Sequence, residues 1–116
     1  MRVGDCFDDS SSSSDEISGV AGVPCAQAHD NEIYAIYNVT ESEYPSDEVM
    51  GEIAWEGCYD RFESFVGRDY ESSQLDIFPM YPSKDSWRLK DDREVICAVY
   101  DMDLAKLNGT AADLGL

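Results

Sequence analysis

Apolar side chains alternate along residues 32–39, EIYAIYNV, with a period of two residues. The odd-numbered residues of this segment would point to one side of an extended chain, and the even-numbered residues to the other. Both sets are largely apolar, so we predict a strand near the middle of a sheet. The face that we expect to be shared is formed by Ile33, Ala35, Tyr37 and Val39.

Shorter patterns of the same kind predict four further strands. They lie at residues 3–8, 19–25, 75–81 and 94–100. The first two flank a Ser-rich stretch, which predicts a polar loop between them. Pro79 lies inside the third strand. Because proline cannot donate a backbone hydrogen bond, we expect this strand at a sheet edge or at a bulge.

Residues 47–66 have helical periodicity instead, with apolar positions at steps of three and four residues. Ser46 is placed to cap the N-terminus of this helix, and the acidic Asp47 and Glu48 suit the positive end of the helix dipole. Gly67 is placed to end the helix. The predicted buried stripe consists of Met50, Ile53, Ala54, Gly57, Cys58, Phe62 and Phe65.

The order of the predicted elements defines the fold class. A single short helical turn is expected at residues 83–87, SKDSW, with Ser83 as its cap. The order strand, strand, strand, helix, strand, short helix, strand predicts an α+β domain with a small, mostly antiparallel sheet and one main helix packed across it. We expect residues 1–101 to form this single domain, with a Ser-rich loop at about 8–18, and residues 102–116 to form a C-terminal tail that frays.

The charge of the chain excludes some partners. It contains 25 acidic and 8 basic residues, for a formal net charge of −17. Nucleic acids and anionic lipids are bound through Lys and Arg, so neither is an expected partner. The carboxylates are spread along the chain and do not have the spacing of a calcium-binding loop. We therefore expect a solvated acidic surface and neither a metal ion nor a cofactor.

Neither a membrane span nor a signal segment is visible in the sequence. It contains no run of about 18 apolar residues and does not begin with a charged segment followed by an apolar one. We expect no direct membrane insertion by this segment, and expect any leader or anchor of the full-length protein to lie outside it.

The four cysteines, at positions 6, 25, 58 and 97, contain no closely spaced pair of the kind that usually binds zinc. Three disulfide connectivities are open to them, and we favour Cys6–Cys25 with Cys58–Cys97. The first pair brackets the Ser-rich loop. In the second, one cysteine lies on the helix stripe and the other on a strand face that could meet it. Two disulfides imply an oxidising compartment; four buried thiols in a cytosolic protein are the alternative.

Several segments together resemble a known family, the septum-formation-type domain of actinobacterial envelope proteins. The matching segments, in chain order, are VGDCF at 3–7, VPCAQAHDNEIYAIY at 23–37, Cys58, YDRFESFVG at 59–67, YPSKDSW at 81–87 and DREVICAVY at 92–100. The resemblance implies an extracytoplasmic module, at the cell surface or secreted, that is often carried behind a membrane anchor. It also implies an actinobacterial source and a link to septation, but it brings no catalytic residues with it.

Cys25 and His29, the single histidine, are the first candidates for chemistry. A reactive pair would need a free thiolate with a base within hydrogen-bond reach, and a disulfide at Cys25 would remove it. We therefore favour a structural role, in which the His29 ring bonds a carboxylate or a backbone group. Asp30 and Glu32 are the nearest carboxylates in the sequence.

Trp87 and Arg93 are the second candidates. An exposed tryptophan could stack on a sugar, with Tyr81 and Trp55 extending the platform, but we favour a Trp87 that closes one end of the core. Arg93 is expected to pair with a nearby carboxylate, that of Asp91, Asp92 or Glu94.

We predict a non-enzymatic binding module of the cell envelope that recognises an envelope or division protein, or a wall component, through a surface on the sheet. Two alternatives remain. One is an enzyme that acts on cell-wall glycan or peptide through carboxylates near Trp87. The other is a scaffold domain of a larger anchored protein.

Overall fold

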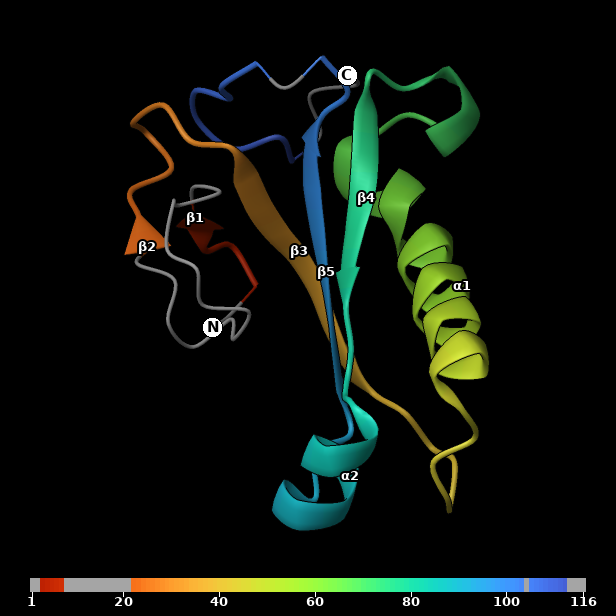
Figure 1. The fold of residues 1–116 in the computed structure, drawn as a ribbon. Coiled ribbons are helices and arrows are strands. Elements are labelled where there is room, and N and C mark those ends of the chain that lie inside the picture. Colours follow the sequence, from red (N-terminus) through yellow and green to blue (C-terminus); the bar gives the residue numbers. More distant parts are fainter. Residues whose placement is uncertain (1–2, 8–21, 104, 113–116) are drawn as a thin grey trace.

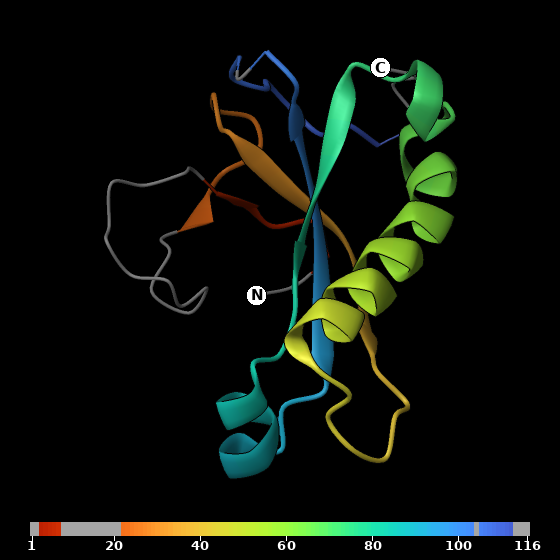
Figure 2. The ribbon, with the colours of Figure 1, turned by 45° about the vertical axis from the view of Figure 1, so that its right-hand side comes forward.

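A computed structural model describes residues 3–7, 22–103 and 105–112. These residues form a five-stranded antiparallel sheet in the order β2-β1-β3-β5-β4, with the long helix α1 across one face (Figures 1 and 2). The strands are β1 (Cys6–Phe7), β2 (Gly22–Val23), β3 (Asn31–Asn38), β4 (Leu75–Met80) and β5 (Glu94–Asp101). The predicted fold class is confirmed. The Ser-rich loop expected at about 8–18 lies outside the described residues.

The central position predicted for β3 is confirmed, since it lies between β1 and β5. Its expected alternation is wrong at one point. A β-bulge between Ile33 and Ala35 shifts the register against β5. Ile33 therefore packs on the face opposite α1, whereas Tyr34, Ala35 and Tyr37 pack on the face that α1 covers. The extra residue of a bulge reverses the side-chain alternation of the strand beyond it.

Helix α1 (Asp47–Val66) has the predicted bounds. The Ser46 hydroxyl accepts a hydrogen bond from the backbone N–H of Val49 at 3.1 Å, and Gly67 ends the helix with a left-handed φ of 86°. The predicted stripe is largely confirmed, although three of its members are only half-buried and Val66 was not expected in it. The fully buried helix residues are Met50, Ala54, Cys58, Phe62 and Val66.

Side chains pack on both faces of the sheet. The larger cluster lies between α1 and the sheet and includes residues of α1, β3, β4 and β5. The smaller cluster lies on the opposite face and consists of Phe7, Ile33, Ile96 and Ala98, with Ile36 and Met80 against them. Apolar burial on both faces is consistent with the largely apolar sequence of β3.

Two short helices complete the described elements. The 3-10 helix η2 (Tyr70–Ser72), which the sequence analysis did not predict, follows α1. Helix α2 (Lys84–Lys90) is longer than the single turn expected, and Ser83 with Ser86 forms a capping box at its start. None of the described helices is both long and apolar enough to cross a membrane.

The chain after β5 folds back along the domain. Leu107 and His29 exchange two backbone hydrogen bonds, of 2.9 and 2.7 Å. Leu107 and Ala111 are buried. Residues 105–112 therefore pack against the start of β3, at the end of the sheet opposite α2 (Figure 1).

Candidate functional site

An aromatic cluster joins α1 to η2. The Tyr70 ring makes edge contacts with Trp55, Tyr59 and Phe62, with ring centroids 5.4 to 5.7 Å apart. Phe62 belongs to the core, whereas Trp55 is 36% exposed and Tyr59 38% exposed. Tyr70 thus connects the core to an exposed aromatic surface, which we define as Trp55, Tyr59 and Tyr70 and call the aromatic face.

Carboxylates surround this aromatic face. Helix α1 itself has six acidic residues and one basic residue, Arg61. The Tyr59 hydroxyl donates to the Glu71 carboxylate, which raises the pKa of Tyr59. Burial and a 2.7 Å hydrogen bond to Asp76 raise the pKa of Tyr70 to about 12. An aromatic surface that is surrounded by carboxylates is suited to bind cations, because a ring face and a carboxylate both attract positive charge.

Trp87 does not offer a free platform for a sugar. Its side chain is 6% exposed, and the Arg93 guanidinium lies 3.7 Å from the centre of its ring. Tyr44 contacts the ring edge-on. Arg93 also donates to the Trp87 carbonyl oxygen at 3.0 Å and pairs with Asp91 at 3.1 Å. The geometry is that of a residue that closes one end of the core.

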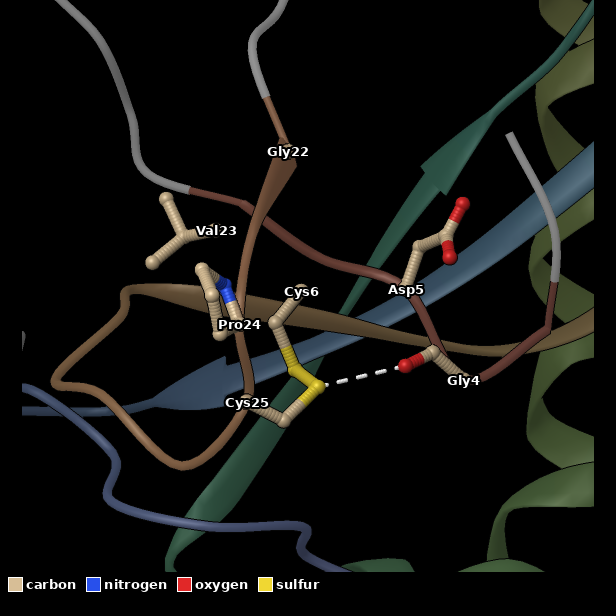
Figure 3. A pocket seen from close by; sticks show the side chains of 7 residues that line it. All are labelled: Gly4, Asp5, Cys6, Gly22, Val23, Pro24 and Cys25. Carbon is tan, nitrogen blue, oxygen red and sulfur yellow. Dashed lines mark hydrogen bonds between the residues drawn. A yellow bond between two sulfur atoms is a disulfide. The ribbon is translucent and has the colours of Figure 1, made fainter.

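A second candidate region surrounds the Cys6–Cys25 disulfide. A pocket of about 340 Å³ lies beside this disulfide (Figure 3). The Cys25 Sγ atom lies 3.2 Å from the carbonyl oxygen of Gly4. We interpret this as a sulfur–oxygen contact, since a disulfide sulfur has no hydrogen to donate. The pocket is lined by Gly4, Asp5, Cys6, Gly22, Val23, Pro24 and Cys25.

His29 and Glu32 lie behind the same disulfide, and both are buried. The His29 Nδ1 atom is 2.8 Å from the Gln27 carbonyl oxygen, so the ring bonds a backbone group and neither of the two carboxylates nearest in sequence. The Glu32 carboxylate accepts hydrogen bonds from Thr110 Oγ1 at 2.6 Å and from the Ala111 N–H at 2.7 Å. Both side chains therefore have defined orientations beneath residues 105–112.

Both predicted disulfides are present, which leaves none of the four cysteines free. Cys58 and Cys97 are fully buried and connect α1 to β5. Cys25 therefore lacks the free thiolate that a reactive pair with His29 would need.

A sheet with one helix across it and two disulfides places this chain among small disulfide-linked α+β domains. The model of the septum formation family matches residues 3–114, so the chain belongs to this family. No curated protein and no solved structure matches the chain. Family membership and the two disulfides suggest an extracytoplasmic domain with a link to septation.

The sequence pattern indicated the residues of the disulfide region but not the aromatic face. Trp55 was expected to extend a platform at Trp87, whereas its ring contacts Tyr70. Tyr70 lies in a short helix that shows no periodic pattern. Its ring contacts to α1 depend on the turn that follows the helix, and the sequence does not reveal the geometry of this turn. The spacing of Trp55 and Tyr59, four residues apart on a helix, was the one signal that could have indicated a shared exposed surface.

Proposed function

We propose that this domain is a non-enzymatic binding module of the cell envelope, and that it takes a basic segment of an envelope or division protein on its aromatic face. The observation that carries this proposal is the partial exposure of Trp55 and Tyr59 within an acidic surface. Large aromatic side chains at exposed positions are typical of binding sites. In the full-length protein, we expect a membrane anchor outside these residues.

The charge of the molecule supports a cationic partner. A net charge of −17 attracts basic chains over long distances and repels acidic ones. At short range, the charged groups of Lys and Arg side chains of the partner would lie over the ring faces, where the carboxylates of α1 attract the same charge. This differs from the sheet surface that the sequence favoured, because the exposed rings lie on the helix.

The test is the titration of the purified domain with lysine- and arginine-rich peptides at several salt concentrations, with calorimetry as the readout. We expect binding that weakens as salt rises. Trp55→Ala should weaken it roughly two- to fivefold, the value of one exposed cation–π contact. Leu89→Ala is the control, since Leu89 is 74% exposed but lies on α2, away from the aromatic face.

Equal affinities of the two variants, or no peptide binding at all, would contradict the proposal. Soluble fragments of cell-wall glycan and peptide are titrated in parallel. Their binding through Trp55 would make a wall component the partner. Cleavage of these fragments would contradict a binding module and support the alternative of an enzyme that acts on the cell wall. A domain that binds neither class of probe would favour a scaffold role.

A further inference from the structure

Three potential metal ligands converge behind the Cys6–Cys25 disulfide. The Sγ atom of Cys6, a ring nitrogen of His29 and a carboxylate oxygen of Glu32 all lie within 4.8 Å of one another. All three side chains are at most 2% exposed. Thiolate, imidazole and carboxylate are the three ligand types that zinc uses in proteins.

His29 has a nitrogen with nothing to bind. Because Nδ1–H donates to the Gln27 carbonyl oxygen, the neutral ring has its lone pair on Nε2. Nε2 is buried and has no hydrogen-bond partner in the described structure. Buried polar atoms without a partner are rare, and each one needs an explanation. A histidine that ligates a metal through one nitrogen almost always donates from the other, often to a backbone carbonyl.

Glu32 is oriented in the same manner. Each of its two carboxylate oxygens accepts one hydrogen bond, from Thr110 and Ala111 respectively, and each keeps further lone-pair capacity. Hydrogen bonds of this kind hold a ligating carboxylate in position. The supporting contacts for two zinc ligands are therefore already in place. That of His29 comes from Gln27, two residues away, and those of Glu32 come from residues 110 and 111, which are distant in the sequence.

The third ligand is blocked in this structure, because Cys6 is bonded to Cys25. The two disulfides differ in how accessible they are. Cys58 and Cys97 are fully buried, whereas Cys25 is half-buried and lines the pocket in Figure 3. A thiol can therefore approach Cys25 far more readily than either sulfur of the core disulfide.

We propose that the Cys6–Cys25 disulfide gates a zinc site that is formed by Cys6, His29 and Glu32. A thiolate of a dithiol reductant attacks Cys25 Sγ, the Cys6–Cys25 bond breaks, and its electron pair leaves on Cys6 as a thiolate. The second thiolate of the reductant attacks the mixed disulfide and releases Cys25, so the reductant becomes a disulfide and the domain gains two electrons.

Zinc then binds the Cys6 thiolate, His29 Nε2 and Glu32, with the Cys25 thiolate or a water molecule as the fourth ligand. One thiolate and one carboxylate neutralise the charge of the ion within the buried region. Bonds of about 2.0 to 2.3 Å in a tetrahedral site place ligand atoms roughly 3.3 to 3.8 Å apart. Since the three ligand atoms lie within 4.8 Å of one another, the cluster has to contract by at most about 1.5 Å. Reduction of the disulfide frees Cys6 for this movement.

Two single variants that remove the same disulfide test this proposal. Cys25→Ser leaves the thiol of Cys6 within the cluster, whereas Cys6→Ser leaves only the thiol of Cys25. Zn²⁺ binding is measured under anaerobic conditions without reductant, and Co²⁺ absorption reports thiolate ligation. We expect Cys25→Ser to bind one ion, oxidised wild type to bind none, and Cys6→Ser to bind at least tenfold more weakly than Cys25→Ser. Circular dichroism and intact mass confirm the fold and the Cys58–Cys97 disulfide.

A second comparison does not depend on these variants. Wild type and Glu32→Gln are reduced selectively at Cys6–Cys25 and titrated with Zn²⁺, and the bound ion is counted by native mass spectrometry. We expect one ion on wild type and at least tenfold weaker binding to Glu32→Gln. Absence of binding to reduced wild type would overturn the proposal. Equal binding by Cys25→Ser and Cys6→Ser would also overturn it.

Discussion

Gly57 leaves room on α1 for the ring of Tyr37. A Cβ atom at position 57 would lie 1.9 Å from the Tyr37 hydroxyl oxygen and 2.3 Å from the adjacent ring carbon. The ring cannot move away without loss, since its hydroxyl donates to the Ile53 carbonyl oxygen at 3.0 Å and Arg61 lies 4.2 Å from its centre. At this position the missing side chain is a packing requirement of the helix–sheet contact.

We therefore expect Gly57→Ala to lower the free energy of unfolding by about 1 to 3 kcal/mol, the usual cost of overpacking. Urea unfolding at neutral pH measures it. Gly51→Ala is the matched control in the same helix, because its Cβ would meet only the side chain of Tyr81, 3.3 Å from the hydroxyl oxygen, and Tyr81 is 44% exposed. At position 51, alanine should raise the free energy of unfolding by up to about 1 kcal/mol through its higher helix propensity. Similar changes in the free energy of unfolding for the two substitutions would contradict this account of Gly57.

Tyr70 makes a contribution to the free energy of unfolding that is lost at alkaline pH. Burial, and secondly the hydrogen bond to Asp76, raise its pKa to about 12. In the unfolded chain this hydroxyl ionises near pH 10. As the pH rises above 10, deprotonation therefore stabilises the unfolded state before it stabilises the folded state. The contribution is complete below pH 10 and is lost as the pH rises towards 12.

We expect the free energy of unfolding to fall between pH 10 and 12, and to fall less steeply in Tyr70→Phe. Urea unfolding across this range, with tyrosinate absorbance of the folded protein, measures both quantities. Parallel pH profiles for the two proteins would show that the raised pKa of Tyr70 does not contribute. The substitution keeps the ring, and with it the contacts to Trp55 and Tyr59. Any remaining change in packing would shift the free energy of unfolding equally at every pH and would not change its slope against pH.

Strand β4 is an exposed sheet edge whose outward donors are occupied or absent. Alternation along the strand directs the N–H groups of residues 75, 77 and 79 away from β5. The N–H of Leu75 donates to the Ser73 hydroxyl at 3.0 Å and that of Ile77 to the Asp76 carboxylate at 2.7 Å. Pro79 has no N–H. An edge without free donors is a poor template for a further strand.

Pro79→Val should restore one outward donor and speed aggregation. The clearest condition is near pH 4, where Asp and Glu carboxylates titrate and the net negative charge that keeps chains apart is reduced. Amyloid-dye fluorescence over time compares the variant with wild type and with Phe78→Val. In this control the new valine keeps an N–H that faces β5. Equal rates in all three proteins would show that Pro79 does not protect the edge.

For the molecule as a whole, the two disulfides tie together segments that are 19 and 39 residues apart. In the chain-entropy model these closures contribute about 3 and about 4 kcal/mol respectively. Cys58–Cys97 also fills the contact between α1 and the sheet, where both side chains are fully buried. The chain relies on these closures because a domain of 116 residues buries only a modest core.

We expect the double variant Cys58→Ser with Cys97→Ser to lose more stability than Cys6→Ser with Cys25→Ser. The first loses the larger closure term and places two hydroxyls in an apolar core, which adds a desolvation cost. Urea unfolding of both variants and of wild type measures the order. The reverse order would show that the segment around Cys6 and Cys25 contributes more to the fold than the helix–sheet contact does.

The sequence by itself determined the elements whose signals are local. The caps Ser46 and Gly67 fixed the ends of α1, Pro79 indicated an edge strand, and the positions of Cys58 and Cys97 on two apolar faces indicated their pairing. These features depend on hydrogen bonds and periodicity within a few residues, which the order of residue types encodes directly.

Only the tertiary structure decided what depends on segments far apart in the sequence. The bulge in β3 arises from its register against β5, so alternation within β3 could not reveal it. The burial of His29 and Glu32 requires residues 105–112 to return over the start of β3, and the aromatic face requires η2 to return to α1. Such contacts form because particular surfaces fit together after the elements have formed, and no local pattern specifies that fit.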